Sequence, residues 1–212
     1  MKRSALSSLS FLEKWTVLGI VIGVVAGLSS VALYFLIRAI EYLLLVRAAG
    51  LYIPIPPGEG GATGCPPGAR FSLLLPAIVG IGGMLSALII RLSPEASGNG
   101  TDRAVESYHF RNGAFSRWSW AAKMLSSAIT IGSGGSAGRE GPEAFISAGI
   151  SSEIFSLLRL SPEDRRLAVA VAMGAGIGTI FKAPIAGAIL SAELLYRRDF
   201  EYEAIFPSLI AS

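Results

Sequence analysis

The chain has 212 residues, of which 52% are hydrophobic and only 16% are charged. Soluble domains carry about 25% charged residues, and the mean hydropathy here is +0.58, so a soluble monomer and a disordered chain are both excluded. The net charge of +3 comes from basic residues that flank apolar segments, which argues against a nucleic-acid partner. A single cysteine, Cys65, excludes an internal disulfide and a cysteine-built metal site, and we expect no cofactor. The composition predicts an integral membrane protein.

Two uncharged runs, 15–37 and 71–90, reach the length of about 20 residues that a transmembrane helix requires. The first run carries Gly19, Gly23 and Gly27 at four-residue spacing. Small residues at this spacing allow a second helix to approach closely. We therefore predict a helix-packing stripe there rather than a ligand site.

Segment 53–67, between the two runs, is too rich in proline and glycine to form a helix. It is predicted to be an aqueous loop in which Cys65 is incidental. An excess of lysine and arginine marks cytoplasmic segments, so we expect a multi-pass protein of the cell membrane with a cytoplasmic N-terminus. The basic residues are Lys2, Arg3 and Lys14 before the first run, and Arg91, Arg103, Arg111, Arg117 and Lys123 after the second.

Beyond residue 100 the uncharged runs become short and interrupted. Runs 124–138, 167–181 and 183–192 are each too short for an ordinary spanning helix, and glycine, proline or ionisable residues bound them. Discontinuous helices of this kind surround the substrate sites of transporters near the middle of the membrane. The chain ends inside an apolar run, which favours a part of a longer membrane protein.

The glycine-rich segment 131–142 matches several motifs. Residues 132–137 fit the dinucleotide pattern G-x-G-x-x-A, with Glu153 about twenty residues further on, but no alternation of strands and helices surrounds them. The G-x-S-x-G pattern around Ser136 fits a serine hydrolase, yet the only histidine, His109, precedes the serine, against the order in that fold. A Walker A loop is excluded because no Gly-Lys-Ser/Thr follows.

An anion site made of backbone is the physical alternative. Successive glycines expose N–H groups, and Pro142 is well placed as the first residue of a helix. The N-terminus of a helix offers unpaired N–H donors and a positive partial charge, which suit a halide. A carboxylate can occupy the same place, and Glu140 lies in this loop; the alternative for Glu140 is an ion pair with Arg139 or Lys182.

Two blocks carry a family resemblance. Gly138-Arg-Glu-Gly-Pro142, preceded by Gly132-Ser-Gly, and the segment 175–187, which fits G-x-x-x-x-F-x-A-P-x-A-G, resemble the CLC family of chloride channels and proton–chloride exchangers. The resemblance implies an all-α membrane bundle of tilted and discontinuous helices with two halves of inverted topology. Residues 1–212 would be the N-terminal half of that transport domain. It also implies a homodimer in the lipid bilayer with one anion pathway per subunit.

The resemblance also assigns roles to residues. In the family, helix N-termini converge on dehydrated anions, and the glutamate of G-R-E-G-P is a gate whose carboxylate competes with chloride. That role falls on Glu140. The anion-binding residues implied are Asn99, Gly100, Gly138, Arg139, Glu140, Gly141 and Pro142.

The chain departs from the family pattern at three points. Where the family has G-S-G-I-P, this chain has Gly98-Asn99-Gly100-Thr101-Asp102, so Asn99 either donates to an anion or caps the following helix. Proton-coupled members often carry a second acidic residue after Glu193, whereas this chain has Leu194, which favours a channel. The family's second half, with its phenylalanine motif and coordinating tyrosine, is absent from these residues.

We therefore predict a transporter of chloride or a similar small anion, not an enzyme, gated by Glu140. A proton-coupled exchanger is the alternative. A membrane-embedded serine hydrolase using Ser136 and a non-transporting scaffold are the rivals from other classes. We assign no site role to Lys182 or to His109, which is predicted to be solvated or bonded to a loop. Glu193 is predicted to be structural, buried near a dimer interface.

Overall fold

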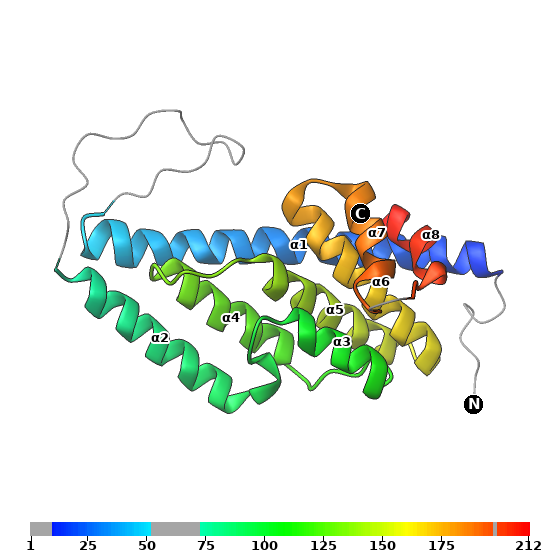
Figure 1. Cartoon of the computed structure of the whole chain (residues 1–212), viewed down its shortest axis with the longest axis horizontal. Helices are drawn as coiled ribbons and strands as arrows, with labels where there is room; N and C mark the ends of the chain where they lie inside the picture. The colour runs from blue at the N-terminus through cyan, green and yellow to red at the C-terminus, as the bar shows by residue number, and fades with distance from the viewer. Residues whose placement is uncertain (1–9, 52–72, 197–198) are drawn as a thin grey trace.

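The computed structural model describes residues 10–51, 73–196 and 199–212, and all regular structure in these ranges is helical. The long helix α1 runs along the molecule, and α4 lies between α1 and α2 (Figure 1). The elements are α1 (Phe11–Glu41), the π-helical segment η2 (Tyr42–Ala48), α2 (Leu75–Leu92), the 3-10 turn η4 (Pro94–Ala96), α3 (Thr101–Phe110), α4 (Ser119–Gly132), α5 (Glu140–Leu157), α6 (Pro162–Phe181), α7 (Pro184–Glu193) and α8 (Tyr202–Ala211).

The first helix is apolar on both of its faces. It begins at a capping box formed by Ser10 and Glu13. One face is buried against the bundle, as at Leu18 and Ile22, while the opposite face exposes large apolar side chains such as Val24. A helix that is apolar all round belongs in a core or a membrane. By length and composition, α1 with η2 and α2 are both able to cross a membrane, as the two uncharged runs predict.

The glycine stripe of α1 packs against α8. A Cβ on Gly23 would lie 2.6 Å from the carbonyl oxygen of Ala211, and one on Gly19 would lie 3.0 Å from that of Pro207. The close approach of two backbones therefore requires glycine at both positions. At Gly27 a Cβ would meet nothing within 4 Å. The helix-packing prediction is confirmed for the first two glycines, and no helix of the described residues tests it at the third.

The centre of the bundle is the pair α5 and α6, whose facing surfaces are small and polar. Ser147 of α5 donates a hydrogen bond to the carbonyl of Ala172 on α6 at 2.8 Å. The uncharged run 167–181 lies within α6, which has 20 residues but is not among the described helices that are apolar enough to cross a membrane. The helix is longer because Ser161 caps a polar first turn that hydropathy alone leaves out.

The shorter runs agree with the sequence-based expectation of interrupted helices. Helix α4 ends at Gly132, and residues 133–139 form a non-helical link to α5. Helix α7 has only 10 residues, between a left-handed Lys182 and Leu194. The predicted loop 53–67 with Cys65, and the basic residues Lys2 and Arg3, lie outside the described residues.

Candidate functional site

Helix α5 starts two residues earlier than the sequence suggested. Its first residue is Glu140, with Arg139 at the N-cap, so Pro142 is the third helical residue rather than the first. Proline fits anywhere in the first turn because the N–H that it lacks would have no helical partner there. The start at Glu140 also places an acidic side chain in the first turn, beside the positive end of the helix dipole.

The link before α5 leaves a series of backbone donors unpaired. At the end of α4, the N–H of Gly135 donates to the carbonyl oxygen of Thr130 at 2.9 Å. At the start of α5, the N–H of Glu143 donates to the carbonyl oxygen of Arg139. Between them, the N–H groups of Ser136, Ala137, Gly138, Glu140 and Gly141 have no acceptor among the described residues. Unpaired donors at a helix N-terminus are the elements of an anion site.

A second loop, which precedes α3, touches the start of α5. Gly100 has a φ of +110°, and a Cβ there would lie 2.6 Å from Gly141 O. A Cβ on Gly141 would in turn lie 2.8 Å from Asn99 O and would overlap the Asn99 side-chain oxygen. The contact therefore depends on glycine on both sides. It brings together the two motifs that the sequence places about forty residues apart.

Asn99 does not cap α3. The N-cap of α3 is Gly100, and no side chain bonds to the first turn. The capping alternative for Asn99 is therefore wrong. Its side chain is exposed and faces a cavity, which leaves the alternative of donation to an anion as a prediction.

The cavity between the two loops has a volume of about 310 Å³. Its wall includes three of the predicted anion-binding residues, together with hydroxyl groups of α4 and a lysine. The residues that matter here are Asn99, Gly138, Pro142, Lys123, Ser127 and Thr130.

Lys123 is a residue whose role the sequence analysis missed. The excess of basic residues after the second run predicts a cytoplasmic position for Lys123, but its side chain on α4 is only 3% exposed. Its ammonium donates to Ala96 O at 3.2 Å and to Gly98 O at 2.5 Å, and so fixes the loop that carries Asn99. A buried cation at this wall also favours an anion in the cavity.

The carboxylate of Glu140 folds back over the link. A Cβ on Gly138 would overlap its Oε2, so the carboxylate lies directly against the backbone of the glycine-rich segment. Arg139 points elsewhere: its guanidinium lies 5.9 Å from the centre of the Tyr34 ring, and it lines a different cavity with Lys182. The structure thus separates the Arg139 side chain from the other predicted anion-binding residues.

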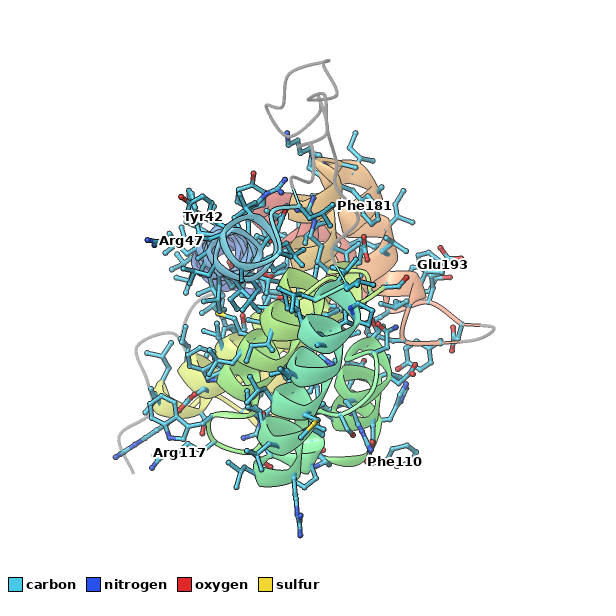
Figure 2. All side chains as sticks on the ribbon, turned by 90° about the vertical axis from the view of Figure 1, so that its left-hand side faces the viewer. Tyr42, Arg47, Phe110, Arg117, Phe181 and Glu193 are labelled. Carbon is cyan, nitrogen blue, oxygen red and sulfur yellow. The ribbon has the colours of Figure 1, made fainter. Side chains whose placement is uncertain are left out.

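Three other residues considered from the sequence do not line this cavity. Glu193 is exposed at the end of α7 and projects outward (Figure 2). The ring of His109 bonds to Leu195 O at 2.7 Å, as predicted for a loop-bonded histidine. Ser136 is exposed, and the described residues contain no strand, so they do not form the strand–turn–helix elbow of the hydrolase alternative.

A second residue that the sequence analysis missed is Glu143, one turn into α5. It is 0% exposed, and one carboxyl oxygen lies 2.5 Å from the hydroxyl of Ser29 on α1. The other carboxyl oxygen has no partner among the described residues. No sequence signal identifies the contact between Ser29 and Glu143, because it depends on how α1 packs against α5.

The sequence matches one known protein family over more than half of its length. The sequence profile of the family described as voltage gated chloride channel matches residues 82–212. The chain belongs to this family. Members of this family are membrane transporters and channels, so the chain belongs to a family of membrane proteins, as the two motif blocks predict.

Three similar proteins illustrate the relationship. An uncharacterized protein of Methanocaldococcus jannaschii is 30% identical over 94% of this chain and 42% of its own length. The H(+)/Cl(-) exchange transporter ClcA of Yersinia pestis is 31% identical over 59% of this chain and 27% of its own. The crystal structure of a slow cyanobacterial Cl-/H+ antiporter has a TM-score of 0.60 at 24% identity, over 96% of this chain and 46% of that one.

The match to the antiporter structure shows that the fold of this chain is a helical bundle of the CLC type, as predicted. The chain spans less than half the length of the curated relatives it matches.

Proposed function

We propose that this chain forms one side of a pathway for chloride or a similar small anion across the cell membrane. The observation that carries the proposal is the unpaired backbone N–H series of the link before α5, set against the Asn99 loop. Backbone donors and a helix N-terminus stabilise an anion without a direct cationic ligand. Lys123 adds a buried positive charge and holds the second loop in place.

In this proposal Glu140 is the gate. Its carboxylate lies on the same backbone segment that offers the unpaired N–H groups. A carboxylate and a chloride ion carry the same charge and suit the same kind of donor, so a chloride ion bound beside this carboxylate is disfavoured. Protonation or displacement of Glu140 then removes the competing negative charge from beside the unpaired N–H groups.

The test is chloride flux from liposomes that contain the full-length gene product carrying this sequence. Wild-type protein should release chloride, and Glu140→Gln should change both the rate and its dependence on pH. A matched control is Glu106→Gln, which alters a surface glutamate paired with Arg103 and leaves the cavity intact. If Glu140→Gln behaves like Glu106→Gln, the gating role is wrong.

A proton-coupled exchanger is the second candidate. It is supported by the relatives and the solved structure that are named as exchangers or antiporters. The channel is supported by Leu194, which cannot bind a proton at a position where exchangers often have an acid. The reversal potential under a fixed chloride gradient separates the two, since it shifts with pH only if protons move with chloride.

The proposal extends to the number of subunits and to their orientation in the membrane. We infer a homodimer in the lipid bilayer, with a cytoplasmic N-terminus and with residues 1–212 supplying the N-terminal half of each subunit's transport domain. The anion is the substrate, with protons as the exchanged species in the exchanger alternative, and neither an enzymatic reaction nor a cofactor takes part. Cross-linking in native membranes and accessibility of a tag at the N-terminus test these two points.

A further inference from the structure

The carboxylate of Glu95 lies at the start of the segment that carries the candidate anion site. Glu95 is in η4, the turn directly before the Asn99 loop, residues 97–100. One carboxylate oxygen accepts a hydrogen bond from the guanidinium of Arg111, and the other accepts the backbone N–H of Ser116 at 2.7 Å. The Glu95 side chain is only 10% exposed, so these two donors compensate for most of the water that it has lost.

The two donors belong to segment 111–118, which links α3 to α4 and is itself fixed to the centre of the bundle. Ser152 of α5 donates a hydrogen bond to Gly113 O at 2.5 Å. Arg165 of α6 donates a hydrogen bond to Asn112 O at 2.8 Å. A Cβ on Gly113 would lie 2.9 Å from Arg165 O, so the segment also packs directly against the backbone of α6. Segment 111–118 is therefore a fixed support, and the carboxylate attaches η4 to it.

Helices α4 and α5 hold the remainder of the Asn99 loop. Lys123 of α4 donates to a backbone carbonyl of the loop at 2.5 Å, and a Cβ on Gly100 would lie 2.6 Å from Gly141 O. These contacts fix the middle and the end of the loop, whereas the carboxylate of Glu95 fixes the turn from which the loop starts. The backbone position of Asn99 therefore depends on all three attachments.

Glu95 acts on the candidate site through the Asn99 loop and not by direct contact. Its side chain does not line the cavity of about 310 Å³ between the two loops. A negative charge near this cavity would by itself oppose an anion, and the ion pair with Arg111 offsets that charge. A carboxylate at this position therefore supports an anion site only by fixing the geometry of the loop.

We propose that Glu95 is a positioning residue of the candidate anion site. Its carboxylate ties η4 to segment 111–118 and thereby holds the side chain of Asn99 at the cavity. A loop that is already ordered binds an anion more tightly, because it does not have to be ordered when the anion arrives. The link to the anion rests on the proposed function, whereas the tie between η4 and segment 111–118 does not.

The first arm of the test measures the tie without chloride, by hydrogen–deuterium exchange of the full-length gene product that carries this sequence. The amides of Ala96 and Ser97 close η4 by donating to carbonyl oxygens three residues earlier, so their exchange reports on the order of this turn. In Glu95→Gln their exchange should be about tenfold faster, because a hydrogen bond between charged groups is lost.

Two further variants make the exchange result specific. The matched control is Glu41→Gln, which changes a glutamate of similar exposure, 13%, that pairs with Arg38 on α1, and it should leave the exchange of η4 unchanged. Arg111→Gln removes the partner of Glu95 at a side chain that is 43% exposed, and it should speed the exchange of η4 even if Glu95→Gln does not fold. Unchanged exchange of η4 in the folded variants would overturn the proposal.

The second arm measures the Kd of chloride by isothermal titration of the same proteins. Glu95→Gln should raise this Kd by about tenfold, whereas Glu41→Gln should leave it unchanged. Removal of a negative charge near the site would by itself lower the Kd, so the sign of the change separates positioning from electrostatics. A loss of stability alone would lower the fraction of the protein that binds chloride and would leave the Kd of the folded fraction unchanged.

The two arms together distinguish the possible failures. Faster exchange of η4 in Glu95→Gln with an unchanged or lower Kd would overturn the role of Glu95 in the anion site. If the wild type binds no chloride, the proposed function fails, and the exchange arm alone decides whether Glu95 ties η4 to segment 111–118.

Discussion

The contact between the two loops is tested most sharply by adding one methyl group to Gly141. In Gly141→Ala the new Cβ would overlap the Asn99 side chain and lie 2.8 Å from Asn99 O, which is backbone and cannot rotate away. Overpacking of this kind costs about 1–3 kcal/mol, and alanine in a helix returns about 0.5–1 kcal/mol relative to glycine. Taken from the middle of each range, the net strain is about 1.3 kcal/mol.

The strain is relieved if the Asn99 loop moves away from α5, and the same free energy then appears as weaker anion binding. At 1.4 kcal/mol per factor of ten, we expect chloride affinity to fall by about 8-fold. Isothermal titration of chloride into the purified full-length protein measures this change. The matched control is Gly80→Ala, where a Cβ on a helical glycine would meet nothing within 4 Å.

Gly80→Ala should leave chloride affinity unchanged. The reasoning is refuted if Gly141→Ala and Gly80→Ala bind chloride equally well, because the two loops would then not form a common site.

Three further predictions address other parts of the structure. Lys123→Met removes two hydrogen bonds donated by a charged group and should lower the free energy of unfolding by about 1.5–3 kcal/mol. The melting temperature in detergent should fall, and an unchanged melting temperature would contradict the structural role of Lys123. Glu140→Gln should make chloride flux insensitive to pH, and a flux with the wild-type pH profile would count against the gate. Gly23→Leu should destabilise the protein by displacing α8, whereas Gly27→Leu, with open space around it, should melt as the wild type does; equal melting of the two variants would contradict the packing of α1 on α8.

The sequence allowed the architecture to be predicted where hydropathy alone decides it. The uninterrupted runs identify α1 and α2, and glycine and proline mark the ends of α4 and α7. Hydropathy underestimates α6 because Ser161 caps a charged first turn that remains helical. The start of α5 was misplaced because Pro142 is acceptable at any position of a first turn.

The glycines of the candidate site could be predicted from the sequence, whereas two of its charged residues could not. Glycine patterns identify backbone that must be exposed or closely packed, and Gly100 and Gly141 do meet in the structure. The charged residues were not predictable in this way. In the sequence, Lys123 looks like a basic residue that marks the cytoplasmic side, because its hydrogen-bond acceptors lie about 25 residues earlier and come close only in the folded chain. The hydrogen-bond partner of Glu143 is a serine 114 residues away.

The central claim, that the start of α5 and the Asn99 loop hold an anion, is tested most directly by anomalous diffraction from crystals of the full-length protein grown in bromide. Bromide replaces chloride and scatters anomalously, so its position is located without assuming any contacts. The account predicts a peak in the cavity lined by Asn99, Gly138 and Pro142, within hydrogen-bond distance of the unpaired N–H groups. A cavity without a peak, with bromide bound elsewhere in the same crystals, would contradict it.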